Sequence, residues 1–380
     1  MIFSISLSAY EVQEDNVFKR IVSLSVSVIL CFVLLSCANN SGKISNDNRY
    51  VSVQTESASA ETNLETEKKS EVKTLDIYII AGQSNAAGYT KINEDTLKTL
   101  WSQYKTGSSS VLYSGKAEYT NNSGTPNVST GVNAVSFWVN AKAGQGRGKD
   151  YMGPELGMAK ILSEEYYDGV NKTAGILKFA HGGTSLLNKV DGENAASGNW
   201  VSPSYAEYLG IQYEGLTGGL YRSLLTQVSD GIARLGGKGY EDINIKGLFW
   251  MQGESDRSQP NEYSIAFKYF VEDIRRDLGD LMNEDLSEMA VMIGEISETV
   301  ASASQSSVLA NKSFIAMQRK LAEEIDNAYI IASSQYRINE WVNGADVKDL
   351  YQNDVWHWNT EKMFAVGELV GRCVIDKILI

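Results

Sequence analysis

Five short apolar runs, each followed directly by glycine or polar residues, constrain the fold of this chain most strongly. They span residues 75–81, 174–180, 245–251, 290–296 and 328–333. Runs that are apolar at almost every position are typical of strands buried on both faces of a parallel sheet. Apolar residues at helical spacing fill residues 155–165, 220–235, 261–278, 313–325 and 360–378. This alternation predicts right-handed crossovers, and therefore an α/β fold with a five-stranded parallel sheet between two layers of helices.

The N-terminus has the pattern of an export signal. Lys19 and Arg20 precede an apolar run, residues 21–36, that is too short for a membrane span of about 20 residues. We therefore predict a signal peptide over residues 1–36, with a short buried helix or an uncleaved anchor as the alternatives. The ending Leu-Leu-Ser-Cys resembles a bacterial lipobox, which implies lipidation at Cys37 and a lipid-anchored protein of the bacterial cell envelope, periplasmic or cell-surface. Residues 1–16 fit no signal pattern, as if the start codon had been assigned too far upstream.

The segment after Cys37 is polar as far as residue 73. It is rich in Ser, Asn, Thr and Glu, and such a composition buries too little apolar surface to order itself. We predict a flexible tether over residues 37–73 and one catalytic domain over residues 74–380. Within it, residues 101–150 are expected to form a long irregular insertion and residues 183–215 a second irregular loop.

Charge and residue counts exclude several functions. The formal net charge of −13 would repel a phosphate backbone, so we expect no nucleic-acid partner. The 3 cysteines form no CxxC pair, and the 2 histidines are not clustered with carboxylates at metal-ligand spacing. We therefore expect no metal and no organic cofactor.

Polar and glycine residues follow three of the predicted strands. The segments are GQSN at 82–85, HGGTS at 181–185 and QGESD at 252–256. Ligands of open parallel sheets bind at the carboxyl ends of the strands. The three segments are therefore expected to meet in one site.

Ser84 is the candidate nucleophile, because it follows a buried strand at the expected start of a helix. A serine hydroxyl needs an adjacent base. In Asp354-Val355-Trp356-His357 the carboxylate can bond the imidazole N–H and fix its tautomer. His181 is the rival base. The alternatives are a helix cap at Ser84 or Asn85, and a packed histidine beside a capped C-terminal helix.

An ester-cleaving serine also needs donors for the oxyanion. The candidates are the backbone N–H of Ser84, a glycine N–H from Gly183 or Gly153, and a side-chain amide from Gln252 or Asn85. A plain turn is the alternative for the glycine pair at 182–183.

Five blocks together resemble the SGNH hydrolase superfamily, and within it the sialate O-acetylesterase-like (SASA) branch, carbohydrate esterase family six. They are IAGQSNAAG (80–88), GPE (153–155), HGGTSL (181–186), WMQGESD (250–256) and DVWHWN (354–359). Their order matches the family. The resemblance implies a flavodoxin-like three-layer fold with Ser84 as nucleophile, His357 as base and Asp354 as the acid that orients it. Glu254 is either a further orienting carboxylate or a structural one.

The resemblance also implies the reaction. We expect an esterase that removes O-acetyl groups from a glycan, either acetyl xylan or O-acetylated sialic acid, by two-step acyl transfer. Gln83, Thr184, Arg257 and Trp358 are expected to bind substrate. Arg257 and Tyr89 flank the catalytic blocks and are expected to line the pocket. Aromatic residues of the 101–150 insertion either stack on sugar rings or pin the insertion to the domain. The alternative functions are a catalytically silent glycan-binding lipoprotein and a serine hydrolase of lipid or peptide acyl groups.

Overall fold

The computed structural model describes residues 72–117, 119–120, 126–127, 136–189, 198–299, 305–336, 340–342, 345–347 and 356–379. Contacts divide the chain into two units, Met1–Glu67 and Lys68–Ile380, and the fold below is that of the second. The predicted signal peptide, Cys37 and the tether up to residue 71 lie outside the described residues, so these remain predictions.

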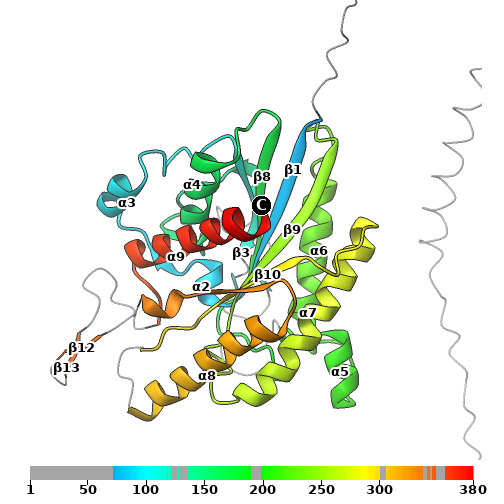
Figure 1. The fold of residues 1–380 in the computed structure, drawn as a ribbon, viewed down its shortest axis with the longest axis vertical. Helices are drawn as coiled ribbons and strands as arrows, with labels where there is room; N and C mark the ends of the chain where they lie inside the picture. The colour runs from blue at the N-terminus through cyan, green and yellow to red at the C-terminus, as the bar shows by residue number, and fades with distance from the viewer. Residues whose placement is uncertain are drawn as a thin grey trace, which may run out of the picture. The chain divides into compact units, whose positions relative to one another are not determined.

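A mostly parallel sheet of seven strands forms the centre of the domain (Figure 1). The middle strand β1 (Thr74–Gly82) pairs with β8 (Lys172–Ala180) on one side and β9 (Asp242–Met251) on the other. Beyond β9 lie β10 (Ala290–Gly294) and β11 (Ala328–Ile331). These are the five strands predicted from the apolar runs, and the prediction is confirmed.

Two further strands come from the region expected to be irregular. β3 (Val111–Ala117) pairs parallel with β8, and β6 (Ser136–Asn140) pairs antiparallel with β3 at the sheet edge. The expectations of five strands and of an irregular 101–150 segment are therefore wrong here. Val111 and Tyr113 of β3 are buried, but Ser114 and Gly115 follow them directly. These two small residues interrupt the apolar run, so the sequence does not show the pattern of a buried strand.

The aromatic side chains described in this insertion pin it to the domain. Trp101, Tyr104, Tyr113 and Trp138 are all buried. Trp138 donates its indole N–H to the carbonyl of Gly231 at 2.7 Å. These four side chains offer no face to a sugar, while the side chains of Tyr119 and Phe137 lie outside the described residues.

Helices cover the two faces of the sheet, because β1 is apolar on both (Figure 1). Tyr78 and Ile80 pack with α3 (Glu94–Leu100), α4 (Glu155–Glu165) and α9 (Thr360–Cys373), which continues as a π-helix over Val374–Ile378. Ile77 and Ile79 belong to the opposite core, with α6 (Gly219–Ala233), α7 (Pro260–Met282) and α8 (Gln305–Glu324). The five predicted helices are confirmed, and only their ends differ.

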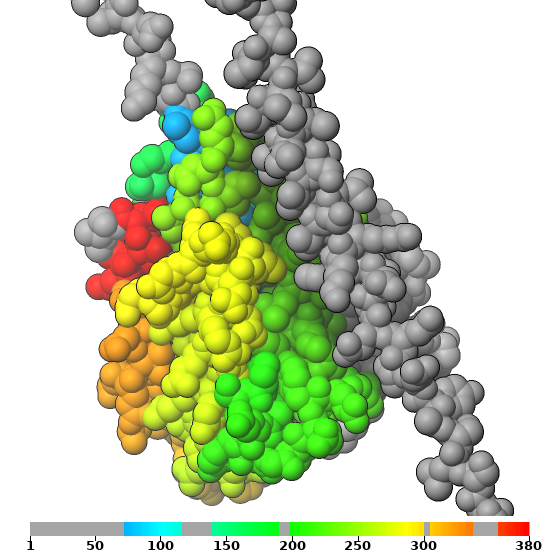
Figure 2. Space-filling view, turned by 90° about the vertical axis from the view of Figure 1, so that its right-hand side faces the viewer, coloured from blue at the N-terminus to red at the C-terminus, as the bar shows by residue number. Residues whose placement is uncertain are grey.

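Short elements complete the domain. α5 (Pro203–Leu209) lies in the second segment expected to be irregular, and Ser204 fastens it to Asp273 of α7; Figure 2 shows both helices at the surface. Three two-stranded ribbons pair β2 (Thr90–Lys91) with β7 (Tyr151–Met152), β4 (Tyr119–Thr120) with β5 (Pro126–Asn127), and β12 (Glu340–Val342) with β13 (Ala345–Val347).

Among the residues the structure describes, none of the helices combines the length and apolarity that crossing a membrane requires.

Candidate active site

A sharp turn brings Ser84 to the end of the central strand. Gly82, the last residue of β1, has φ of +138°, and a Cβ there would lie 2.1 Å from the carbonyl oxygen of Met251. Only glycine allows the chain to turn so close to β9. The four-residue helix α2 (Ser84–Ala87) then begins at Ser84, and the cap is Gln83, whose side chain makes no capping bond. Ser84 and Asn85 lie inside the helix, so the alternative that either residue caps it is wrong.

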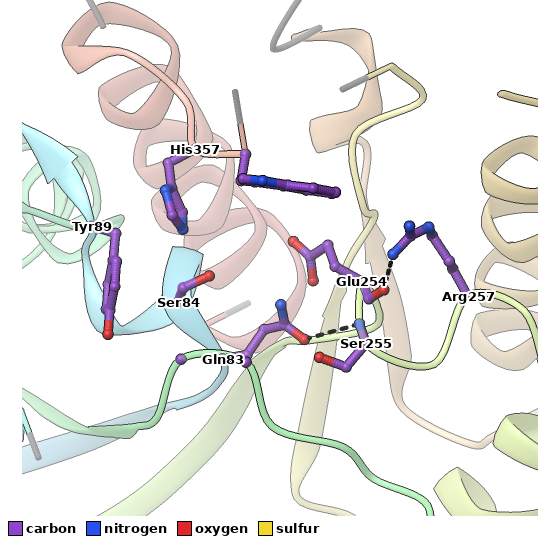
Figure 3. A pocket seen from close by; sticks show the side chains of 10 residues that line it. Gln83, Ser84, Tyr89, Glu254, Ser255, Arg257 and His357 are labelled. Carbon is purple, nitrogen blue, oxygen red and sulfur yellow. Dashed lines mark hydrogen bonds between the residues drawn. The ribbon is translucent and has the colours of Figure 1, made fainter. Parts of the chain in front are cut away.

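A cavity of about 410 Å³ opens over Ser84. Its lining comes from three strand ends and the segment before α9: Gln83, Ser84, Tyr89, Gly182, Gly183, Glu254, Ser255, Arg257, Trp356 and His357. Figure 3 shows the ring of His357 directed toward the side chain of Ser84. The prediction that the polar strand ends meet in one site is confirmed. His181 does not line the cavity, which favours His357 as the base.

The carboxylate of Glu254 points into the same cavity (Figure 3). Its Oε1 accepts a hydrogen bond from Nδ2 of Asn85 at 2.8 Å. Its Oε2 is buried and has no hydrogen-bond partner within the described part of the chain. Burial raises the pKa of the Glu254 carboxyl, and the Asn85 bond and the nearby His357 oppose that rise. Glu254 therefore lies close enough to sense the charge of His357. Asp354, the predicted orienting acid, lies outside the described residues, and its role stays a prediction.

The glycine pair after β8 passes very close to the nucleophile. A Cβ on Gly182 would lie 2.8 Å from the Tyr89 hydroxyl and 3.3 Å from Cβ of Ser84. Gly183 has φ of +68°, a conformation that favours glycine. Backbone N–H groups can therefore approach an ester bound at Ser84, as an oxyanion site requires.

Two of the predicted oxyanion donors are engaged elsewhere. The N–H of Gly153 donates to Oε1 of Glu155 at 2.9 Å. Nε2 of Gln252 donates both of its protons, to the carbonyl of Thr184 at 3.0 Å and to Oδ2 of Asp256 at 2.8 Å. Neither residue lines the cavity. Both hold the surrounding loops in place.

Two of the predicted substrate-binding residues are also buried away from the cavity. The hydroxyl of Thr184 donates to the carbonyl of His181 at 2.7 Å and accepts from Trp200. Trp358 is completely buried, whereas Trp356, two residues earlier, is 45% exposed and lines the cavity. Gln83 and Arg257 line it as expected.

The buried carboxylate of Asp256, for which the sequence predicts no individual role, joins two of the loops. Oδ2 of Asp256 accepts from the backbone N–H of Leu186 at 2.8 Å as well as from Gln252, and its Oδ1 accepts from the hydroxyl of Ser185. These hydrogen bonds join the HGGTSL loop to the QGESD loop and fix the position of the glycine pair. Tyr89 lines the cavity as expected, whereas Ser255 and Trp356 line it without having been predicted. Both are neighbours of motif residues, and adjacency is the only sequence signal for them.

A buried ion pair supports the far end of α2. Nζ of Lys178 on β8 lies 3.0 Å from Oε2 of Glu155, and the two side chains are 1% and 0% exposed. Lys178 also donates to the carbonyl oxygens of Ala87 at 3.1 Å and Gln145 at 2.8 Å. All three of its protons are therefore used, and one holds the last residue of the helix that carries Ser84.

We expect Lys178→Met to destabilise the fold by about 3–5 kcal/mol, because it leaves a buried carboxylate and two carbonyls without their donor. The matched control is Lys105→Met, which removes an exposed partner of Glu94 and is expected to change stability very little. Urea unfolding of both variants measures the difference. Equal losses would show that the buried pair contributes no more than the exposed one.

Comparison with known proteins identifies one family. The profile described as "Carbohydrate esterase, sialic acid-specific acetylesterase" matches residues 74–376. No curated protein matches the chain significantly.

Several solved structures are similar at low identity. A protein from Arabidopsis thaliana is 17% identical, with a TM-score of 0.45 over 80% of this chain and 98% of its own. NanS is 16% identical, with a TM-score of 0.49 over 81% and 98%. A carbohydrate acetylesterase from Xanthomonas citri is 13% identical, with a TM-score of 0.45 over 80% and 56%.

Proposed function

We propose that this chain, which belongs to the sialic acid-specific acetylesterase family of carbohydrate esterases, removes O-acetyl groups from a glycan. In this mechanism Ser84 is the nucleophile and His357 is the base. One observation carries the proposal. Ser84 and His357 come from opposite ends of the domain, yet they line one cavity with the imidazole directed at the serine. A hydroxyl beside an imidazole is the arrangement that makes serine nucleophilic.

The reaction takes two steps. His357 accepts the proton of Ser84 as its oxygen attacks the acetyl carbonyl, and then protonates the sugar oxygen that leaves. Water, activated by the same imidazole, attacks the acetyl-enzyme and releases acetate. The negative charge on the carbonyl oxygen is stabilised in both steps by the N–H groups of Ser84 and Gly183. Asn85 contributes indirectly, since its amide holds Glu254.

Two carboxylates are candidates for stabilising the imidazolium that forms. Asp354, three residues before His357, is the proposed orienting acid. Glu254 faces the same cavity from the loop after β9. Its buried Oε2 has no partner among the residues that the structure describes, which supports a second role near the ring. The proposed arrangement therefore has Asp354 on one nitrogen of the imidazole, with Glu254 adding negative charge nearby.

The acetylated carbohydrate is proposed to be acetyl xylan or an O-acetylated sialic acid outside the cytoplasm. The signal-like N-terminus supports export, and the Leu-Leu-Ser-Cys ending supports a lipid anchor at Cys37 in the cell envelope. The net charge of −13 supports a partner other than nucleic acid.

Acetate release from purified protein tests the substrate proposal. We expect release from acetylated xylan or from O-acetylated sialic acid, and from an aryl acetate as a generic ester. The preferred glycan is identified by the higher kcat/KM. Binding of either glycan with no release of acetate from any of the three esters would contradict the proposal and indicate a silent binding protein.

A further inference from the structure

Tyr89 stands beside the proposed catalytic base. Its ring centroid lies 5.0 Å from that of His357, with the two planes inclined by 34°. Figure 3 shows the tyrosine ring upright next to the imidazole, with its hydroxyl at the end away from His357. That hydroxyl lies at Gly182, where an added Cβ would be 2.8 Å away. One side chain therefore touches both the base and the glycine loop.

The position of Tyr89 is fixed by the peptide unit that joins it to Gly88. Its N–H donates to the carbonyl of Ser84 at 3.2 Å, and the carbonyl of Gly88 accepts from the N–H of Arg147 at 2.9 Å. Gly88 has no room for a side chain, since its Cβ would lie 2.7 Å from the nitrogen of Gly153. The ring is therefore held relative to the nucleophile by rigid, close-packed backbone.

Arg147 secures the ring itself. Its guanidinium carbon lies 4.3 Å from the Tyr89 centroid and 5.2 Å from that of Tyr151. Planar guanidinium groups pack well on aromatic rings. This contact restrains the tyrosine side chain, which in turn limits how far the imidazole can rotate.

We propose that Tyr89 is a positioning residue for His357: its ring holds the imidazole in line with Ser84 and stabilises the imidazolium that forms when Ser84 is deprotonated. The physical basis is the negative electrostatic potential over the face of an aromatic ring, which attracts a cation within about 6 Å. The inference rests on the proposed function, because it assigns a role toward the base of that mechanism.

Other charges also act on the imidazole. The carboxylate of Glu254 faces it across the cavity. The guanidinium of Arg147 packs on the Tyr89 ring, and that of Arg257 lies 5.7 Å from the ring of Trp356. These charged groups remain in Tyr89 variants, but Arg147 loses one of its two aromatic contacts there. Tyr151→Leu removes the other contact and therefore shows how much of a change comes from Arg147.

The test uses Tyr89→Leu, Tyr89→Phe and the control Tyr151→Leu, which removes the other tyrosine that packs against Arg147. The chain has only 2 histidines, so selective labelling gives two imidazole signals in NMR, with His181 as internal reference. We expect Tyr89→Leu to move the titration midpoint of His357 to lower pH and to reduce kcat about tenfold, with a smaller effect on KM. Tyr89→Phe keeps the ring and is expected to restore both, while Tyr151→Leu leaves the midpoint of His357 in place.

Three outcomes would overturn the proposal. The first is an unchanged midpoint in Tyr89→Leu. The second is a loss of activity in Tyr89→Phe as large as in Tyr89→Leu, which would place the effect in the hydroxyl. The third is an equal shift in Tyr151→Leu. The NMR titration needs no substrate, so a wild-type protein that releases no acetate would contradict the proposed function without deciding this inference.

Discussion

Replacing Ser84 by alanine is expected to lower kcat for acetate release by on the order of 10⁴-fold or more. In the proposed mechanism the hydroxyl oxygen forms the bond to the acetyl carbon, so no neighbouring group can replace it. The proposed oxyanion donors are backbone groups and survive the substitution, which is why a small residual rate above that in water should persist. Because Ser84 is almost fully buried at the start of α2 and alanine is a good helix former, the fold should be kept.

Ser255→Ala is the matched control for this experiment. Ser255 lines the same cavity, but in Figure 3 its hydroxyl lies below the Gln83 amide, whereas Ser84 lies next to His357. We expect it to keep kcat within about tenfold. Comparable losses in the two variants would show that the cavity needs its serines for shape or hydration and that Ser84 is not the nucleophile.

Replacing His357 by asparagine is expected to reduce kcat/KM by a similar 10⁴- to 10⁶-fold, because nucleophile and base act as one unit. The pH profile gives a second readout. Wild-type activity should fall at acid pH as the imidazole is protonated, and this limb should disappear from the residual activity of the variant. Measuring kcat/KM from pH 4 to 9 on an aryl acetate compares the two.

His181→Asn is the control that distinguishes the two histidines. His181 is 2% exposed, lies outside the cavity lining, and its backbone N–H donates to the carbonyl of Gly82 at 3.0 Å. We expect it to lower stability while keeping kcat/KM within about tenfold and the acid limb intact. The reverse pattern, with an acid limb lost in His181→Asn, would assign the base to His181.

The sheet was predictable where strands are apolar throughout. Strands β1, β8, β9, β10 and β11 are central or covered on both faces, so their sequences are continuous apolar runs. β3 contains Ser114 and Gly115, and β6 is a short edge strand. Both therefore lack that pattern. Their places in the sheet depend on the pairing of β3 with β8 and of β6 with β3, which no local sequence pattern reports.

The site was predictable at the level of loops and less so at the level of side chains. GQSN, HGGTS and QGESD follow strands whose ends must meet, so their convergence follows from the parallel sheet. Which side chains enter the cavity depends on the turn each loop makes. The side chain of Gln252 turns inward and donates to the carbonyl of Thr184, and the Thr184 hydroxyl donates to the carbonyl of His181. Glu254, two residues after Gln252, turns into the cavity instead.

The direction of side chains also explains why Trp356 lines the cavity, although Trp358 was the predicted residue. Both lie next to His357 in sequence. Trp358 is followed by Asn359, whose side chain caps α9, and its own ring is buried in the core under that helix. Trp356 precedes the helix and stays at the surface. Adjacency to a catalytic residue therefore identified the segment but not the side chain.

The central claim is that Ser84 forms a covalent acyl-enzyme with the help of His357. Incubation with a fluorophosphonate, followed by intact-mass measurement and peptide mapping, tests it most directly. We predict one phosphonyl group per chain, attached to Ser84, with labelling much slower in His357→Asn and absent in Ser84→Ala. A label on another residue, or labelling that proceeds unchanged in the His357 variant, would contradict the account.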